Sequence, residues 1–378
     1  MYDVIIIGAG SVGTPAAMSL ASRNVRTLVL DSGSSAGQGN NKCAIGGIRA
    51  THGEPAKVAL SLHSLKTFST WKEKHGDDIG WHMGGYTFVA YEEAIAESLR
   101  KMIPAQQKAG LNIQWHGPEK IMEIVPGINQ DGLLGGTFSP EDGSASPMES
   151  CYAFHRYAVR QGAEFRFNEE VRSITKNSDF KVETTRGTYT APIVINCAGS
   201  YAREIGAMLG VDLPVYPDMH EAGITEPVQR FFHPMVVDIK RAPGSANYYF
   251  YQYSTGQVVF CITPDPPRLG TGTAETSEFL PMVSRRMVDL YPRLANLKVR
   301  RTWKGCYPQT PDGSPIIGET GVKGFLAAVG MCGQGFMLGP GVGEVLARLV
   351  TGKTSDEDRM VLDAMALNRE FSGTEALK

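Results

Sequence analysis

The first thirty residues alternate between apolar and mixed segments in the order strand, helix, strand. Residues 3–7 form a short β-branched run, which is typical of a parallel strand buried on both faces. Residues 14–23 then read as a helix with small residues on its inner side, and residues 26–30 form a second buried strand. This pattern predicts a complete βαβ unit at the start of the chain.

Similar pieces recur further along the chain, separated by segments of another kind. Residues 193–199 read as a buried parallel strand that ends at a helix start, and residues 325–329 lead through a glycine cluster into a long helix that ends near residue 352. The alternation of aromatic and polar residues over 216–260 predicts a half-exposed antiparallel sheet. The remaining elements expected are helices over 54–74, 92–109, 147–161 and 276–291, and strands over 84–91, 164–168, 171–176, 180–185 and 298–307.

Parallel pieces at the start, middle and end, with antiparallel material inserted twice, predict two domains that are interleaved in sequence. The fold class is α/β (α+β overall). We expect one domain from residues 1–80, 145–215 and 300–378, and the second from residues 81–144 and 216–299.

Composition narrows the class of protein. The chain has 378 residues, is 42% hydrophobic and carries a formal net charge of -2, so it can bury a sizeable core and lacks the basic excess of a nucleic-acid binder. Its six cysteines form no C-x-x-C pair, which argues against a disulfide framework and against a metal site. No apolar run is long enough to span a membrane, and no basic leader precedes the first strand. We therefore expect a cytoplasmic protein.

A glycine-rich turn follows the first strand. Gly8, Gly10 and Gly13 form G-x-G-x-x-G between strand and helix, and Asp31 closes the second strand. The glycines permit a tight turn, close approach of a pyrophosphate and close helix packing, and Asp31 can accept hydrogen bonds from ribose hydroxyls. The pattern predicts a bound dinucleotide, either NAD or FAD. The polar loop 39–47 and a second glycine cluster at residues 330–343 favour FAD.

These segments together resemble the D-amino-acid oxidase / sarcosine oxidase flavoprotein superfamily, and the resemblance covers nearly the whole chain. It is carried by residues 4–13 with Asp31, and by residues 194–199, 310–318 and 328–336. It implies a Rossmann-like FAD-binding domain of the glutathione-reductase type, interleaved with an antiparallel-sheet substrate domain. Residues 301–305 and 335–337 most resemble the branch that contains the β subunits of dye-linked L-proline dehydrogenases and of heterotetrameric sarcosine oxidases.

The resemblance also implies a set of FAD contacts. They are Gly8, Gly10, Ser11, Gly13, Asp31, Ser32, Asn41, Ile45, Gly46, Val171, Ala198, Gly199, Gly333, Gly335, Phe336 and Met337.

Substrate contacts are implied in the same way. Arg49 matches an arginine that clamps the substrate carboxylate, a role that suits a planar, permanently charged guanidinium; the alternative is an arginine that caps the next helix. Tyr249 and Tyr251 lie on one face of a strand of the sheet that roofs the substrate cavity, although ordinary sheet packing explains either one equally well. His220 and Met337 complete the candidate substrate contacts. A lone histidine on a strand is more often structural, and this applies to His220 and also to His52.

Four departures from the family pattern refine the expectation. Met337 replaces a second carboxylate-binding lysine of the monomeric sarcosine oxidases, and no lysine occurs between residues 256 and 264, where the oxidases carry the lysine that helps to activate oxygen. Poor oxygen reactivity, and hence a dehydrogenase, follows from the second departure. The cysteine that holds FAD covalently falls on Gly305 and not on Cys306, so we predict non-covalent FAD. Residues 146–149 replace the histidine that carries covalent FMN, and FMN at a subunit interface has no support in the sequence.

The sequence thus favours an FAD-dependent dehydrogenase that oxidises the C–N bond of a small secondary or N-alkyl amino acid such as L-proline or sarcosine, by hydride transfer to flavin N5. We assign no catalytic residue. The resemblance implies an α-type redox partner subunit. Two alternatives stay open: a D-amino-acid or glycine dehydrogenase or oxidase of the same superfamily, and an FAD-containing assembly or scaffold subunit with little turnover.

Overall fold

A six-stranded sheet forms one half of the molecule. The computed structural model describes residues 2–372 and residue 377. The sheet order is β18-β19-β12-β1-β2-β8, with bounds Ile316–Glu319, Phe325–Val329, Ile193–Asn196, Val4–Ile7, Thr27–Leu30 and Glu164–Arg166. β1 pairs in parallel with both β2 and β12, whereas β18 runs antiparallel to β19. Every residue of β1 and β2 is buried, as their uninterrupted apolar runs predict.

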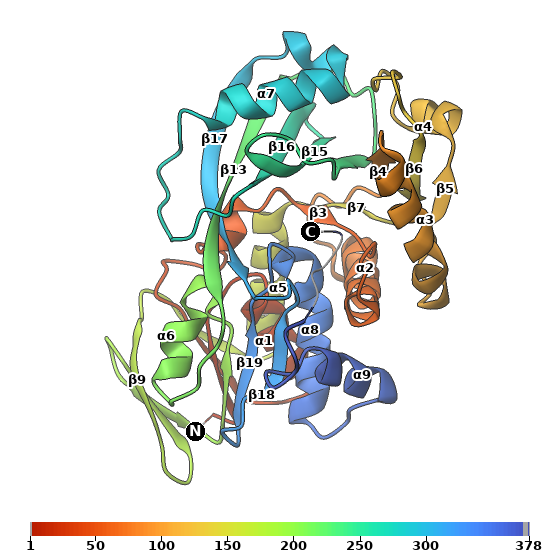
Figure 1. Cartoon of the computed structure of the whole chain (residues 1–378). Helices are drawn as coiled ribbons and strands as arrows, with labels where there is room; N and C mark the ends of the chain where they lie inside the picture. Colours follow the sequence, from red (N-terminus) through yellow and green to blue (C-terminus); the bar gives the residue numbers. More distant parts are fainter. Residues whose placement is uncertain (1, 373–376, 378) are drawn as a thin grey trace.

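Four helices lie on one side of this sheet (Figure 1). They are α1 (Gly13–Ala21), α2 (Pro55–His75), α5 (Pro147–Arg160) and α8 (Gly335–Val350). α8 packs against α1, α2 packs on the outer side of α8, and the four helices share one hydrophobic cluster. On the other face lie a three-stranded sheet of β9 (Val171–Lys176), β10 (Phe180–Thr184) and β11 (Thr188–Ala191), and the short helix α6 (Ala202–Ala207).

The second half of the molecule is an eight-stranded sheet in the order β17-β13-β16-β15-β14-β4-β6-β5. The bounds are Val299–Gln309, Tyr216–Pro227, Gln257–Pro264, Ser245–Gln252, Met235–Asp238, Tyr86–Ala90, Gly135–Ser139 and Gln114–His116. Neighbouring strands are antiparallel except for the parallel pair β4 and β14. α7 (Phe279–Leu290) lies across this sheet, and α3 (Glu93–Lys108) and α4 (Pro118–Ile124) lie at its β4–β6–β5 end (Figure 1).

The expected exposure of this sheet is wrong. β15 is buried on both faces: Tyr248 and Phe250 pack against α7, while Tyr251 belongs to a cluster on the opposite face. Alternation of aromatic and polar residues indicates exposure only where a polar side chain faces water. In β15 the polar atoms point into the interior instead, as shown by Gln252, whose amide donates to the backbone oxygen of Gly256 at 2.9 Å.

Smaller elements complete the chain. β3 (Gly47–Ile48) pairs with β7 (Gly143–Ser144), and single 3-10 turns occur at Asn40–Cys43, Gly199–Tyr201 and Pro292–Asn296. The sequence reading missed α9 (Asp356–Ala364), which begins at a capping box formed by Ser355 and Asp358. Helix α7 begins at Phe279, three residues later than expected. The domain boundaries stay a prediction, although β17 joins the eight-stranded sheet from the 300–378 segment.

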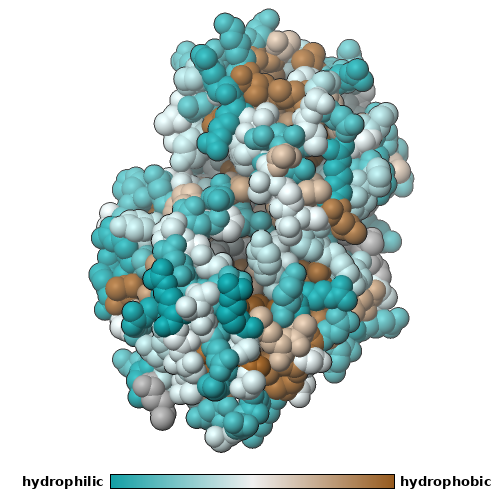
Figure 2. All heavy atoms as spheres, turned by 90° about the vertical axis from the view of Figure 1, so that its left-hand side faces the viewer, coloured by the Kyte–Doolittle hydropathy of each residue, from teal (hydrophilic) through white to brown (hydrophobic). Residues whose placement is uncertain are grey.

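The face of the molecule in Figure 2 is mostly hydrophilic. Hydrophobic residues gather towards its upper end and in its lower half, with hydrophilic residues between them. Hydrophobic residues are common on protein surfaces, so their presence on this face does not by itself mark a binding site. No helix in the described part of the chain combines the length and the apolar character that crossing a membrane requires.

Candidate active site between the two sheets

The glycine-rich turn joins β1 to α1, and each of its glycines has a different surrounding. A Cβ at Gly8, whose φ is +105°, would lie 2.4 Å from the backbone oxygen of Cys197 in the turn after β12. A Cβ at Gly13 would lie 1.8 Å from the backbone oxygen of Gly8, so α1 starts in close contact with the turn. At Gly10 a Cβ would meet nothing within 4 Å. Gly8 and Gly13 thus serve packing, whereas Gly10 leaves its backbone open to a ligand.

Asp31, at the end of β2, orders this turn. Its carboxylate accepts hydrogen bonds from the backbone N–H of Ala9 and of Gly33, both at 2.6 Å. Asp31 is partly exposed, so it keeps accessible lone pairs for a ribose hydroxyl. Ser32 follows it on the surface, and Ser11 lies at the start of α1 against α8.

The loop that follows β2 connects the glycine-rich turn to the eight-stranded sheet. The N–H of Gly37 donates to the backbone oxygen of Ala9 at 2.9 Å, and the hydroxyl of Tyr251 in β15 donates to the backbone oxygen of Ile45 at 2.5 Å. Asn41 is buried, and its Oδ1 has no hydrogen-bond partner among the described residues. Gly46 (φ +95°) passes so close to the backbone oxygen of Ala145 that a Cβ would lie 2.3 Å away.

The residues at the start of α8 lie against β17 of the eight-stranded sheet. Gly333 (φ +81°) lets the backbone pass the ring of Tyr307, to which a Cβ would come within 2.3 Å. Gln334 is 3% exposed, yet neither side-chain polar atom has a hydrogen-bond partner within the described chain. Gly335 begins the helix, and Phe336 and Met337 are buried directly after it.

The remaining FAD candidates follow β12 or begin β9. Ala198 follows β12 and its Cα would be 3.3 Å from a Cβ at Gly8. Gly199 adopts a φ of +58° and opens a 3-10 turn. Val171 is buried at the first position of β9.

These residues fit an extended dinucleotide such as FAD. Gly10 leaves room for a pyrophosphate, Asp31 is placed for the ribose, and the buried polar atoms of Asn41 and Gln334 lack partners in the described chain. Buried polar atoms are normally hydrogen-bonded, so the unpartnered atoms of Asn41 and Gln334 are available to a polar ligand.

Arg49 comes directly after β3 and is 4% exposed. One guanidinium nitrogen, Nη1, donates to the backbone oxygen of Thr51 and lies 3.2 Å from Nδ1 of His52. The other, Nη2, donates to the backbone oxygen of Leu377 at 2.5 Å. Arg49 forms no ion pair with any described residue, and all three of these partners are neutral.

Two aromatic rings flank this guanidinium. Its central carbon lies 5.4 Å from the ring centroid of Phe88 and 6.0 Å from that of Tyr86, both in β4. His52 is completely buried, and burial, together with the charge of Arg49, holds the pKa of its imidazole well below the usual value. His52 is therefore neutral and accepts the Arg49 hydrogen bond at Nδ1. Arg49 does not cap the following helix, because Glu54 occupies that position in α2.

Asp142 lies in the turn between β6 and β7, where it contacts the residues that follow Arg49. Residues 49–51 are called the Arg49 segment below. Asp142 is 0% exposed, and its carboxylate accepts from the N–H of Ala50 at 3.0 Å and from the Thr51 hydroxyl at 3.1 Å. Burial raises the pKa of Asp142 to about 7, an effect that its two hydrogen bonds and the charge of Arg49 oppose.

Of the two candidate tyrosines, Tyr249 contacts another tyrosine, Tyr307 in β17. The hydroxyls of Tyr249 and Tyr307 are 2.5 Å apart, and the ring of His220 stacks on Tyr307 at 3.8 Å. Nε2 of His220 is 3.0 Å from Oδ2 of Asp218, which fixes the ring behind Tyr307. Burial raises the pKa of Tyr249 far above its usual value, so its hydroxyl stays protonated.

Sequence reasoning missed Tyr307 and Asp142. Tyr307 lies two residues beyond Gly305 on β17, and strand alternation from that position could have placed its side chain on the same face. Asp142 sits in a polar turn, where aspartate is common for local reasons. Only the pairing of β3 with β7, which joins residues about 95 positions apart in the chain, reveals its role.

The two cysteines at β17, Cys43 and Cys306, lie on different faces of this strand. A Cβ at Gly305 would lie 2.5 Å from Cβ of Cys43 in the polar loop. Cys306 points to the other face, where its Sγ is 3.4 Å from the backbone oxygen of Gly270. Cys43 is hydrogen-bonded to the backbone oxygen of Lys304 at 3.3 Å.

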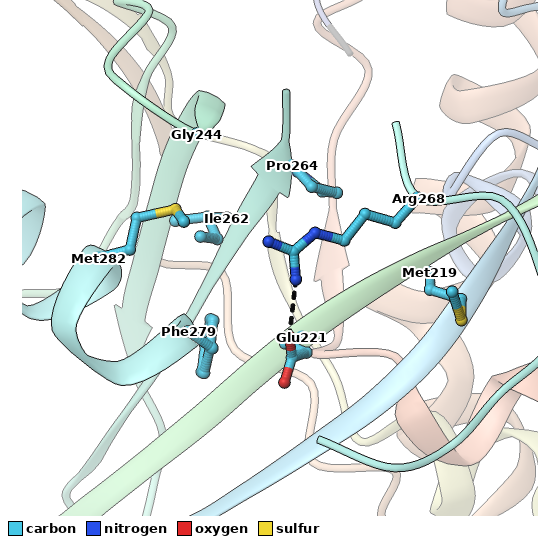
Figure 3. A pocket seen from close by; sticks show the side chains of 8 residues that line it. All are labelled: Met219, Glu221, Gly244, Ile262, Pro264, Arg268, Phe279 and Met282. Carbon is cyan, nitrogen blue, oxygen red and sulfur yellow. Dashed lines mark ion pairs between the residues drawn. The ribbon is translucent and has the colours of Figure 1, made fainter. Parts of the chain in front are cut away.

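A separate pocket lies under α7 and is shown in Figure 3. It is lined by Met219, Glu221, Gly244, Ile262, Pro264, Arg268, Phe279 and Met282, with the ion pair of Arg268 and Glu221 across it. Its cavity volume of about 10 Å³ is only enough for one water molecule. Glu221 also accepts from the N–H of Thr276 at 2.6 Å, so this pair fastens the loop before α7 and is not a substrate site.

Comparison with known proteins places these features in a family. The family DAO, described as FAD dependent oxidoreductase, matches residues 3–349. The crystal structure of L-proline dehydrogenase from P. horikoshii superposes with a TM-score of 0.89 at 29% identity, over 97% of each chain. Sarcosine oxidase subunit beta of Arthrobacter sp is 28% identical over 98% of this chain and 90% of its own length.

A third relative is much longer. Mitochondrial sarcosine dehydrogenase of Mus musculus is 26% identical over 96% of this chain, which spans only 41% of that protein. Because the family match extends over most of the chain and includes the glycine-rich turn, the chain belongs to the DAO family of FAD-dependent oxidoreductases.

Proposed function

We propose that the chain is a dehydrogenase that oxidises the C–N bond of a small secondary or N-alkyl amino acid, such as L-proline or sarcosine. FAD, when bound, supplies the acceptor for the hydride that leaves the substrate carbon. Electrons then pass to an acceptor other than O₂. Residues of the two sheets would bind and orient the substrate, and none of them is assigned as a proton acceptor.

The observation that carries this proposal is the charge of Arg49. A buried guanidinium is costly unless an anion neutralises it, and the partners of Arg49 among the described residues are neutral. A substrate carboxylate would provide the missing charge, with the bidentate geometry that a guanidinium prefers.

The surroundings of Leu377 indicate what else the substrate site can hold. Leu377 is completely buried in the same cluster as Tyr86, Phe88 and Tyr251, while its carbonyl accepts from Arg49. An oxygen acceptor on the guanidinium and an aliphatic group against these rings are therefore compatible in one place. An amino acid with a small apolar portion has both features.

Tyr249 and Met337 are proposed to border the substrate, and His220 acts from behind. The pair of hydroxyls of Tyr249 and Tyr307 faces the start of α8, because Tyr307 lies against Gly333. His220 stacks on Tyr307 and holds its ring in place. His220 would thus position the tyrosine pair and not contact the substrate.

Non-covalent binding of FAD is part of the proposal. The family's attachment position corresponds to Gly305, which has no thiol, and Cys306 points towards Gly270 on the other face of β17. The glycine-rich turn, Asp31 and the start of α8 would hold the cofactor through backbone N–H groups and hydrogen bonds. FMN at a subunit interface is not part of the proposal.

The proposal of an electron acceptor other than O₂ is supported by the composition of β16. This strand, in the stretch where the oxidases place a lysine, has no lysine and mostly buried apolar side chains, so it offers no fixed positive charge to stabilise reduced oxygen. A redox partner subunit is consistent with the relative named as a subunit of sarcosine oxidase. Cys43, Cys151, Cys197, Cys261 and Cys306 are free thiols in the structure, which suits the proposed cytoplasmic location.

Arg49→Lys tests the carboxylate role directly. A lysine keeps the charge but loses the planar, two-point recognition. We expect the KM for the amino acid to rise by about 10- to 100-fold, the loss of about 1.5–3 kcal/mol of charged hydrogen bonding, with FAD content unchanged. Arg26→Lys is the matched control, because Arg26 is exposed and pairs with Asp3 at 2.6 Å. An unchanged KM in Arg49→Lys would contradict the proposal.

A further inference from the structure

Asp142 is a buried acid that the proposed function leaves without a role. It lies in the turn between β6 and β7, and both of its carboxylate oxygens are hydrogen-bonded to the Arg49 segment, to Ala50 and to Thr51. The Thr51 hydroxyl is in turn 2.9 Å from the hydroxyl of Ser139. Because the Thr51 carbonyl accepts from Arg49, Asp142 fixes the piece of backbone that holds the guanidinium.

Charged and titratable groups surround Asp142 on three parts of the chain. Arg49, on the segment after β3, favours its ionised form, whereas Glu141 in the same turn opposes it. Tyr86 in β4 faces it with a hydroxyl whose pKa is raised to about 12, so it stays neutral. His52 is neutral as well, and the next cation along, Lys57, donates to the backbone oxygen of Gly313 at 2.9 Å. Arg49 is thus the principal charge that acts on Asp142.

Resting on the carboxylate role of Arg49, we propose that Asp142 is a positioning residue and charge partner of Arg49, and that binding of a substrate carboxylate is coupled to uptake of one proton by Asp142. Two carboxylates near one buried guanidinium cannot both stay ionised without cost, so one of them takes a proton from solvent. The substrate carboxylate touches the guanidinium directly, and Asp142 does not. Asp142 is therefore the group that becomes neutral.

This coupling makes the affinity of the site for a carboxylate depend on pH. Where Asp142 is ionised, a carboxylate must bring a proton with it, so its affinity falls as the pH rises. Where Asp142 is already protonated, Arg49 acts as an uncompensated cation and binds carboxylates most tightly. The raised pKa of Asp142 places the change near neutral pH.

Asp142→Asn isolates the charge from the hydrogen bonds. The amide oxygen can accept from Ala50, and the amide nitrogen can donate to Thr51, whose hydroxyl then turns to Ser139. The matched control is Glu141→Gln, which removes an exposed charge from the same turn, where Glu141 is bonded to Asn112 at 3.0 Å.

The experiment measures binding of cyclopentanecarboxylate, a carboxylate without an oxidisable amine, to the FAD-loaded protein by calorimetry between pH 6 and 9. Two buffers of different ionisation enthalpy report the number of protons taken up. For the natural sequence and for Glu141→Gln we expect uptake that approaches one proton above pH 7 and a Kd that rises up to tenfold per pH unit. For Asp142→Asn we expect no uptake, a flat Kd, and tighter binding than the natural sequence at pH 9.

Asp142→Asn with the original pH dependence, or with weaker binding at pH 9, would overturn the inference. Thr51→Val gives a second test, because it removes one hydrogen bond to the carboxylate and leaves its charge; the midpoint of proton uptake should move to higher pH, and an unmoved midpoint would also overturn it. Binding that depends on Arg49 but not on pH defeats this inference alone. Absence of binding to the natural sequence defeats the proposed function as well.

Discussion

At the scale of single residues, the candidate site is defined by charges that the fold buries without full compensation. Arg49 is held by neutral acceptors, and Asp142 lies behind it with no solvent access. Burial of either charge costs free energy, which a protein keeps only where another requirement outweighs it. In the proposed function, binding of an anionic substrate is that requirement.

The buried Asp142 should make stability depend on pH. Its pKa is about 7 in the folded chain and 3.8 in the unfolded chain, so the folded state binds the proton more tightly. This contribution to stability is lost as the pH rises from 4 to 7. Between pH 5 and 8 the natural protein should lose up to about 3 kcal/mol more unfolding free energy than Asp142→Asn, from two pH units at about 1.4 kcal/mol each.

Urea unfolding of both proteins at the two pH values, at equal FAD saturation, checks this. Equal losses in the two proteins would mean that Asp142 is ionised in the folded state throughout the range.

At the scale of elements, the glycines of the turn from β1 to α1 have different roles. Gly13 allows close packing of the helix against the turn, and Gly10 leaves space for a ligand. Gly13→Ala should fail to fold, because its Cβ would lie 1.8 Å from the backbone oxygen of Gly8. Gly10→Ala should fold, because a Cβ there has open space in the chain itself, but the methyl group would occupy the approach of the pyrophosphate.

The ratio of flavin absorbance to protein, with circular dichroism for folding, distinguishes the two variants. Gly117→Ala, at a position where the atom nearest to a Cβ would be 3.5 Å away, serves as the control. Full flavin content in Gly10→Ala would contradict the assigned pyrophosphate position.

Elements whose pattern is local were predictable, and contacts between distant segments were not. Strands β1 and β2 and the glycine-rich turn follow from contiguous residues. The burial of β15 on both faces does not, because it depends on α7, which lies some thirty residues further along the chain. Asp142 reaches Ala50 only through the pairing of β3 with β7. The short helix α9 was missed because its capping box is a weak signal beside the long apolar α8.

At the scale of the whole molecule, the proposed substrate site lies where the loop after β2 joins the two sheets, and residue 377 also reaches it. The Leu377 carbonyl occupies Nη2 of Arg49, so a substrate carboxylate would have to displace it. Deletion of residues 373–378 should therefore lower the KM for the amino acid by several-fold and leave kcat nearly unchanged. Leu377→Gly, which keeps the carbonyl, should have the smaller effect. Steady-state kinetics on both variants measures this, and a raised KM after the deletion would show that residue 377 supports the site.

The central claim is tested most directly by anaerobic reduction of the bound flavin with a panel of L-proline, sarcosine, glycine and D-alanine. We predict that the flavin absorbance bleaches with a secondary amino acid, L-proline or sarcosine, and returns quickly with an artificial dye but slowly with O₂. Bleaching by glycine or D-alanine alone would contradict the proposed substrate class. A fully loaded flavin that no amino acid bleaches would contradict the assignment of this chain as an amino-acid dehydrogenase.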